Sequence, residues 1–131
     1  MRITVGRDER SDIVTVRAEG HSGYAPSGSD IVCAAVSAVV QTAVLGVRQA
    51  AGCEAVVKTG DALIEAKFAR RGAKPAGPAD AGQDAEGGGS QGWPEAQAIL
   101  EAMLLGLREI EDGRRRYVRV TETRVEGGAT T

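Results

Sequence analysis

The sequence predicts an α/β fold of two layers, in which a mixed or antiparallel sheet packs on two helices. Two pairs of short segments rich in β-branched residues are typical of hairpins, and two long segments have the apolar patterning of helices. With a final strand, the predicted order is β-β-α-β-β-α-β. A chain of 131 residues can bury one sizeable core, so residues 1–131 are expected to form a single domain.

The predicted strands form two hairpins and one closing strand. The first hairpin turns at the polar residues 8–11, and the second turns at Gly60 and Asp61. In the second hairpin, apolar side chains alternate with Glu65 and Lys67, so one face should lie on the core. The strands are predicted at residues 2–7, 12–18, 53–59, 62–69 and 116–125.

Two helices are predicted between these strands. Asp30 is a good N-cap for the first, which is apolar on nearly every side and stops at Gly52, so we expect it at the centre of the domain. Its apolar run, residues 31–47, is a few residues shorter than the roughly 20 of a membrane span. The second helix starts at Pro94 and ends at Gly113, with one apolar face.

Composition changes abruptly at residues 70–92. This segment has seven glycines, two prolines and no apolar residue larger than alanine. It buries too little surface to offset the entropy lost on ordering, so we expect a flexible surface insertion within the single domain.

Charge and cysteine content exclude some functions. A net charge of -2 and 3% aromatic residues argue against nucleic-acid binding, with Arg114, Arg115 and Arg116 as the one local basic cluster. Two cysteines do not make a disulfide framework, and Met1 leads straight into a strand-like segment instead of a signal peptide. We therefore expect a cytoplasmic protein with reduced thiols.

His21, the only histidine, and Cys33 lie on either side of a glycine-rich loop. With Asp30 as N-cap, Cys33 occupies the third helical position, where free N–H groups and the helix dipole favour a thiolate. A nearby histidine can accept the thiol proton and return it to a leaving amine. The backbone N–H groups of Cys33 and Ala34 are then the candidate oxyanion donors. The alternative is a buried apolar cysteine and a solvated histidine.

Other chemistry is less well supported. Cys53 follows the helix stop at Gly52 with no histidine near it in sequence, so it is expected to be a core thiol. There is no C-x-x-C or paired-histidine spacing for a metal, and no phosphate-loop motif. We expect no metal and no cofactor.

The segment GHSGYAPSGSDIVCAAVS, residues 20–37, resembles the motif of the Prp family of ribosomal-processing cysteine proteases, also called YsxB-like. The resemblance implies a cytoplasmic, homodimeric endopeptidase without a cofactor. Such an enzyme removes the N-terminal extension of large ribosomal subunit protein twenty-seven, cutting after an aromatic residue in a short apolar motif. The 70–92 segment is longer and richer in glycine than in the family. The residues that match in register are Gly20, His21, Gly28, Asp30, Ile31, Val32, Cys33, Ala34, Ala35, Val36 and Ser37.

The resemblance also implies roles for residues. Cys33 is the nucleophile and His21 its base and acid, while Asp30 and Ser37 are candidate assisting residues. Asp30 either caps the helix or orients His21, and Ser37 either contacts the site or bonds back into its helix. The loop is implied to order over the bound peptide, with hinge freedom from glycines and apolar walls from side chains. These loop residues are Gly20, Gly23, Tyr24, Pro26 and Gly28.

Two non-proteolytic functions remain as alternatives. One is a ribosome-associated binding module without enzymatic activity, which would contact RNA or a ribosomal protein through Arg114 to Arg116 and the flexible 70–92 segment. The other is a redox-responsive protein in which Cys33 is the sensor thiol.

Overall fold

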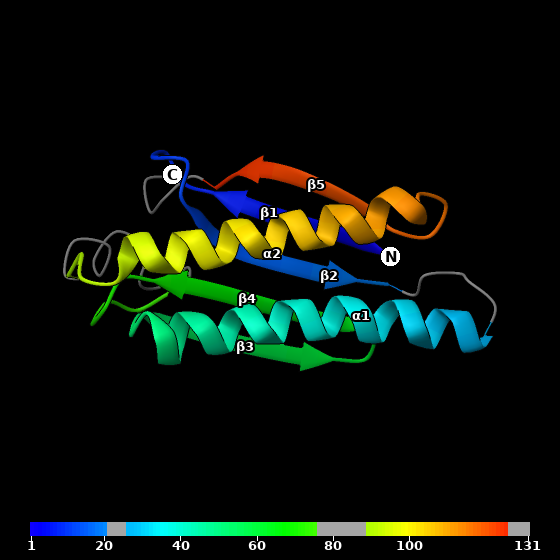
Figure 1. Cartoon of the computed structure of the whole chain (residues 1–131), viewed down its shortest axis with the longest axis horizontal. Helices are drawn as coiled ribbons and strands as arrows, with labels where there is room; N and C mark the ends of the chain where they lie inside the picture. The colour runs from blue at the N-terminus through cyan, green and yellow to red at the C-terminus, as the bar shows by residue number, and fades with distance from the viewer. Residues whose placement is uncertain (21–25, 76–88, 126–131) are drawn as a thin grey trace.

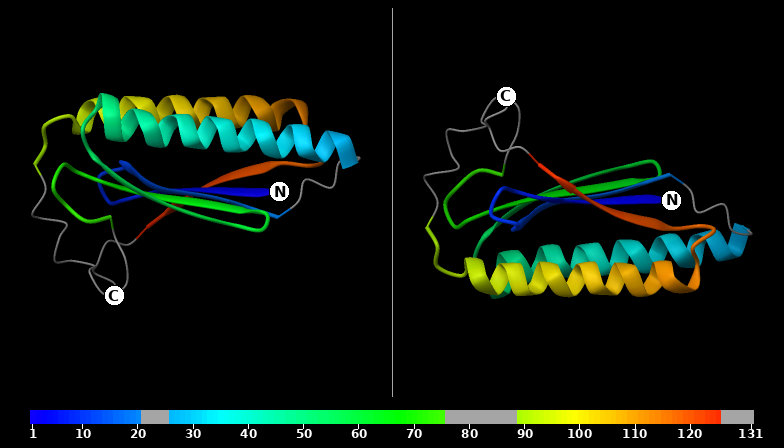
Figure 2. Two further views of the ribbon diagram at one scale, coloured as in Figure 1. Left: turned by 90° about the horizontal axis from the view of Figure 1, so that it is seen from below. Right: turned by 90° about the horizontal axis from the view of Figure 1, so that it is seen from above.

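The computed structural model describes residues 1–20, 26–75 and 89–125 (Figure 1). It confirms the two-layer α/β fold: a five-stranded sheet is covered on one face by two long helices that lie side by side (Figure 2). The elements are β1 (Arg2–Arg7), β2 (Ile13–Glu19), α1 (Pro26–Leu45) with the π-helical turn η1 (Gly46–Ala50), β3 (Glu54–Gly60), β4 (Leu63–Ala69), α2 (Trp93–Gly113) and β5 (Arg119–Arg124).

The sheet is mixed, with strand order β3-β4-β2-β1-β5. β1 pairs antiparallel with β2 and parallel with β5, whereas the other pairs are antiparallel. The chain leaves β4 near one edge of the sheet and crosses the face in α2. It returns as β5 at the opposite edge, so β1, β2 and β4 are the interior strands.

The hydrophobic core lies between the sheet and the two helices. Alternate residues of each strand point toward the helices, as in the cross-strand pair Val5 and Val16, both fully buried. Burying one such side chain stabilises the fold by roughly 1.5–3 kcal/mol. The largest fully buried side chains are Ile3, Val5, Ile13, Val16, Val32, Val36, Val40, Val47, Leu100, Leu107 and Val118.

The expectation that α1 is buried on nearly every side is wrong. Its inner face packs in the core, but Ile31 is 65% exposed and Leu45 is 52% exposed. The fold has one helical layer, and no described element covers the outer side of that layer (Figure 2). By length and composition alone, the stretch Ile31–Ala50 could cross a membrane, but a third of it is buried within this fold.

The first helix also begins earlier than expected. It starts at Pro26, so Asp30 is inside the helix and is not its N-cap, and Gly28 is helical and not part of a loop. Proline suits a first helical turn because its φ is already helical and its missing N–H needs no partner there. The side chains of residues 26–30 lie outside the described part of the structure.

Two further boundaries differ from the sequence prediction. β5 begins at Arg119 and not at residue 116, because Tyr117 and Val118 both donate backbone hydrogen bonds to the carbonyl of Arg114 in a turn. Most of the 70–92 segment, residues 76–88, lies outside the described residues. Its ends pair with each other, since the N–H of Gly89 donates to the carbonyl of Arg71 at 2.8 Å.

Candidate functional site

A cavity of about 200 Å³ opens beside Cys33, between α1 and the strand ends of the sheet. One wall is a face of α1, where Cys33, Val36 and Ser37 are three and four residues apart and so lie together. The opposite wall includes Ala18 of β2 and Ile64 of β4, which are cross-strand partners. The remaining lining residues are Met1, Gly60, Ala62 and Leu63. The cavity is thus mostly apolar, with one thiol and one hydroxyl.

The two cysteines have different environments. Cys33 is half-buried at the cavity, whereas Cys53 is buried in the core, with its sulfur 3.8 Å from the carbonyl oxygens of Ala51 and Gln91. Burial raises the pKa of the Cys53 thiol. The prediction that Cys53 is a core thiol is therefore confirmed, and Cys33 is the cysteine with access to a cavity.

Ser37 lies one turn beyond Cys33 and lines the same cavity. Its Oγ accepts a hydrogen bond from Nε2 of Gln41 at 3.2 Å. The hydroxyl thus lies on the same wall as the thiol and is also bonded to a residue of its own helix, so both alternatives from the sequence stay open.

The strand that leads to His21 is tied to the cavity wall. Gly20, at the end of β2, has a left-handed φ of +87° and donates its N–H to the carbonyl of Ala62 at 2.9 Å. Ala62, in the turn between β3 and β4, also has a left-handed φ, +54°. His21 follows Gly20 directly. It lies outside the described residues together with Gly23 and Tyr24, as do the side chains of Pro26 and Asp30.

The helix start changes the expected environment of the thiol. Cys33 is the eighth residue of α1, not the third. Only the first four N–H groups of a helix lack a partner within it, so those of Cys33 and Ala34 lie beyond the free turn. The expectation that they serve as oxyanion donors relied on a start at Asp30 and loses that support.

The contribution of the β3–β4 turn to the cavity is not predicted from the sequence. Gly60, Ala62 and Leu63 lie about thirty residues after Cys33, and nothing local marks them as site residues. They reach the cavity because β4 pairs with β2 in the interior of the sheet, so the β3–β4 turn lies beside the end of β2. This neighbour relationship depends on strand order, which hairpin patterns do not define.

No metal centre is found in the described part of the chain: no three His, Cys, Asp or Glu side chains there gather closely enough to hold an ion. The described residues thus offer a thiol and an apolar cavity as their chemistry.

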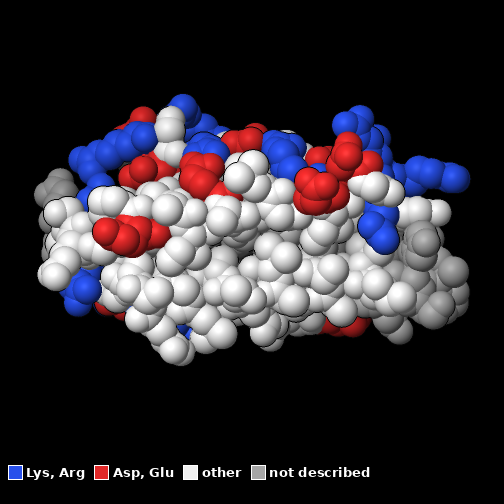
Figure 3. All heavy atoms as spheres, viewed as in Figure 1, with Lys and Arg blue, Asp and Glu red and all other residues white. Residues whose placement is uncertain are grey.

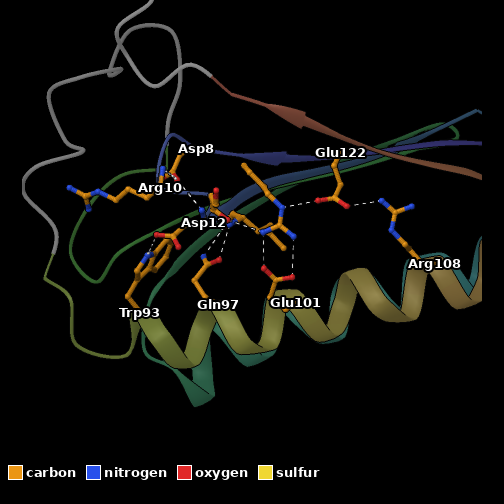
Figure 4. A network of polar contacts seen from close by, with 11 residues as sticks. Asp8, Arg10, Asp12, Trp93, Gln97, Glu101, Arg108 and Glu122 are labelled. Carbon is orange, nitrogen blue, oxygen red and sulfur yellow. Dashed lines mark hydrogen bonds and ion pairs between the residues drawn. The ribbon is translucent and has the colours of Figure 1, made fainter.

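A polar network at the other end of the sheet fastens α2 to the strands (Figure 4). The indole Nε1 of Trp93 donates to Asp12 at 2.9 Å, and Gln97 exchanges two hydrogen bonds with the backbone of Ile13. Arg7, at the end of β1 remote from Gly20, donates to both carboxylate oxygens of Glu101. Because this network lies away from Cys33, we interpret it as structural.

Comparisons with known proteins identify the family of this chain. Residues 1–119 match the family model described as cysteine protease Prp. No curated protein matches the chain significantly.

The fold is similar to solved structures of low sequence identity. SMU.848 from Streptococcus mutans has a TM-score of 0.69 at 21% identity, covering 95% of this chain and 94% of that one. The ribosomal processing protease Prp from Staphylococcus aureus, solved with a substrate peptide, has a TM-score of 0.68 at 19% identity, covering 93% and 98%. The same protease with a covalently linked product peptide has a TM-score of 0.67. With the family model spanning nearly the whole sequence, this chain belongs to the cysteine protease Prp family.

Proposed function

We propose that this protease removes the N-terminal extension of large ribosomal subunit protein twenty-seven, with Cys33 as nucleophile and His21 as base and acid. The observation that carries the proposal is the half-buried Cys33 thiol on the wall of a mostly apolar cavity. The related protease from Staphylococcus aureus is a ribosomal processing enzyme that has been solved with a covalently linked product peptide. That precedent supports a ribosomal protein as the substrate here.

The proposed reaction has two steps. His21 takes the proton of Cys33, and the thiolate attacks the scissile carbonyl carbon; collapse of the adduct breaks the C–N bond, and the amine leaves with the proton from His21. Water then gives a proton to His21 and attacks the thioester, which releases the new carboxyl end and regenerates the thiol. The hydrogen bond from the N–H of Gly20 to the carbonyl of Ala62 supports the pairing of His21 with Cys33, because it holds the residue before His21 against the cavity wall.

The cavity suits an apolar substrate motif with an aromatic residue. An apolar cavity of about 150 Å³ is enough to bind benzene, and this one is about 200 Å³. Ala18, Val36 and Ile64 provide apolar contacts for a ring, and their burial in the core holds the walls rigid.

A second copy of the chain is the proposed partner of the helical face. Figure 3 shows a broad uncharged surface on this side of the molecule. A groove of about 420 Å³ runs between α1 and α2, lined by side chains that include Val39, Ile99 and Met103. Leu105, which precedes the groove residue Gly106 on α2, is 69% exposed. Large exposed apolar surfaces commonly mark protein interfaces, and L105E should shift the protein from dimer to monomer in sedimentation.

The cytoplasm is the proposed compartment, because the mechanism needs Cys33 as a free thiol and a reducing environment keeps it so. This also suits a substrate that is made on ribosomes.

The proposed activity is tested with the precursor of the organism's ribosomal protein twenty-seven. Purified wild-type chain should shorten it by one cut after an aromatic residue, and C33A should not. C53A is the matched control and should retain most of the activity, provided that it is folded by circular dichroism. Equal loss in both folded variants, or no cut by the wild type, would overturn the proposal.

A further inference from the structure

A second cavity, of about 440 Å³, lies at the same end of the sheet as the thiol cavity. Its lining residues are Met1, Arg2, Glu19, Gly20 and Arg119. Arg2, Glu19 and Arg119 alternate with core residues of their strands, so they lie on the sheet face away from the helices. Met1 lines both cavities, which therefore adjoin each other around the strand ends.

The second cavity contains two arginines side by side. Arg2 and Arg119 are direct partners in the parallel pairing of β1 with β5, and both are exposed. Like charges directly opposite each other on neighbouring strands destabilise a sheet. A pair of this kind, placed at a cavity, indicates a role for the charges other than stability.

Neither guanidinium forms an ion pair with a carboxylate among the described residues. Glu19 is the cross-strand partner of Arg2, but its carboxylate accepts a hydrogen bond from the guanidinium of Arg17 at 3.3 Å. Arg119 donates its Nε to the carbonyl of Arg115 at 3.1 Å. In the part of the chain that the structure describes, no carboxylate forms an ion pair with Arg2 or with Arg119, so both side chains can donate hydrogen bonds to an anionic ligand.

We propose that Arg2 and Arg119 form a subsite for an acidic side chain of the peptide being cleaved, an inference that rests on the proposed proteolytic function. A guanidinium binds a carboxylate through two parallel hydrogen bonds, and two guanidinium groups side by side strengthen this preference. The nearby carboxylate of Glu19 disfavours a polyanion such as RNA, which would bring several phosphates to the cavity. One carboxylate therefore fits best.

One extended peptide can occupy the thiol cavity and the arginine subsite together. A strand-like peptide advances about 3.3 Å per residue, so a chain whose aromatic residue occupies the thiol cavity passes Met1 within a few residues. Its acidic residue then lies close to the scissile bond in sequence. The thiol cavity selects an apolar side chain, and the arginine pair selects a carboxylate at a fixed spacing from it.

The test measures binding and cleavage separately. The probes are fluorescent peptides with one phenylalanine in an apolar motif and a single Glu moved along the sequence, each matched by a Gln peptide. Binding is measured by anisotropy with C33A, and cleavage with the wild-type thiol. We expect one Glu position to improve Kd and kcat/KM by about tenfold, and we expect salt to weaken the gain.

Two variants test whether Arg2 and Arg119 cause the preference for the Glu peptides. R2Q/R119Q should bind and cleave each Glu peptide no better than its matched Gln peptide, and its thermal stability should be unchanged or higher. K58Q, which removes an exposed charge on the same sheet face outside the cavity, is the control and should keep the preference.

Equal binding of all Glu and Gln pairs, or a preference that survives in R2Q/R119Q, would overturn the subsite. So would stronger competition by RNA than by a Glu peptide, because that outcome assigns the arginines to a polyanion. Absence of cleavage in the wild type would reject the proposed function instead, while the binding comparison would still decide the subsite.

Discussion

The backbone N–H of Gly20 donates a hydrogen bond to the carbonyl of Ala62 at 2.9 Å, which joins the end of β2 to the turn between β3 and β4. Gly20 immediately precedes His21, and Ala62 lines the cavity that contains Cys33. The two residues of the proposed catalytic pair are 12 positions apart in the chain. Through this hydrogen bond, the residue that precedes His21 in the chain is fixed at the cavity that contains Cys33.

Replacing Gly20 with alanine should reduce activity more than stability. The left-handed φ of +87° disfavours any side chain by about 1 kcal/mol, and relief of this strain would move the start of the histidine loop. We expect a lower kcat in peptide cleavage assays.

Gly72→Ala is the matched control for this prediction, because Gly72 has a similar φ of +81° and no atom near the added Cβ. Both variants should lose similar free energy of unfolding in urea, but only G20A should lose activity. Equal activity in the two variants would show that the hydrogen bond between Gly20 and Ala62 does not contribute to catalysis.

Filling the cavity should weaken substrate binding. Gly60 lines the cavity, its φ lies outside the left-handed region, and an added Cβ would meet only Leu63 at 3.8 Å, so G60L is tolerated by the backbone. The larger side chain would occupy space that the proposal assigns to the aromatic residue. We expect KM to rise by about tenfold or more, with a smaller change in kcat. In G89L, where nothing lies near the added Cβ, an unchanged KM is expected.

The thiols should differ in reactivity. Cys33 is half-buried beside a cavity, whereas Cys53 is buried and its raised pKa disfavours the thiolate. Iodoacetamide should therefore modify Cys33 in the folded protein, and Cys53 only after unfolding. Peptide mapping by mass spectrometry measures this, and rapid labelling of Cys53 in folded protein would show that the core is more open than described.

Acid should weaken the contact between β5 and its neighbours. Hydrogen bonds from Arg7 at 2.8 Å and Arg108 at 2.7 Å lower the pKa of Glu122 below its usual value. Its stabilising contribution is therefore fully present above the unfolded-state pKa of about 4.3 and is lost as pH falls through the lower folded-state pKa.

The E122Q variant tests this dependence. The difference in unfolding free energy between wild type and E122Q should be constant above about pH 5.5 and should shrink below about pH 4. Urea titrations at several pH values measure it. A difference that does not change with pH would mean that the pairs contribute nothing as charges.

Local patterns in the sequence predicted most of the fold. Alternating apolar residues identified β4, and the left-handed Gly52 ended the first helical segment as expected. The start of α1 was misplaced because Asp30 and Pro26 are both good residues for a helix start, and local preference does not choose between them. The exposure of α1 was missed because an apolar face looks the same in sequence whether it meets a core or a partner.

The candidate site could be predicted only in part. Cys33 and Ser37 are one helical turn apart, so their sharing of one wall follows from helical spacing. Ala62 and Met1 enter the site through the pairing of β4 with β2 and of β1 with β2, which are long-range contacts. Such contacts depend on which edges of the hairpins meet, and no local signal encodes that choice.

The role of Cys33 as nucleophile can be measured with a peptide chloromethyl ketone that ends in phenylalanine within an apolar motif. Intact mass and peptide mapping should show one adduct per chain, located on Cys33, together with complete loss of cleavage. The adduct should be absent in C33A and present in C53A. Inactivation by the reagent with the label on Cys53, or cleavage that persists when Cys33 is fully modified, would show that Cys33 is not the nucleophile.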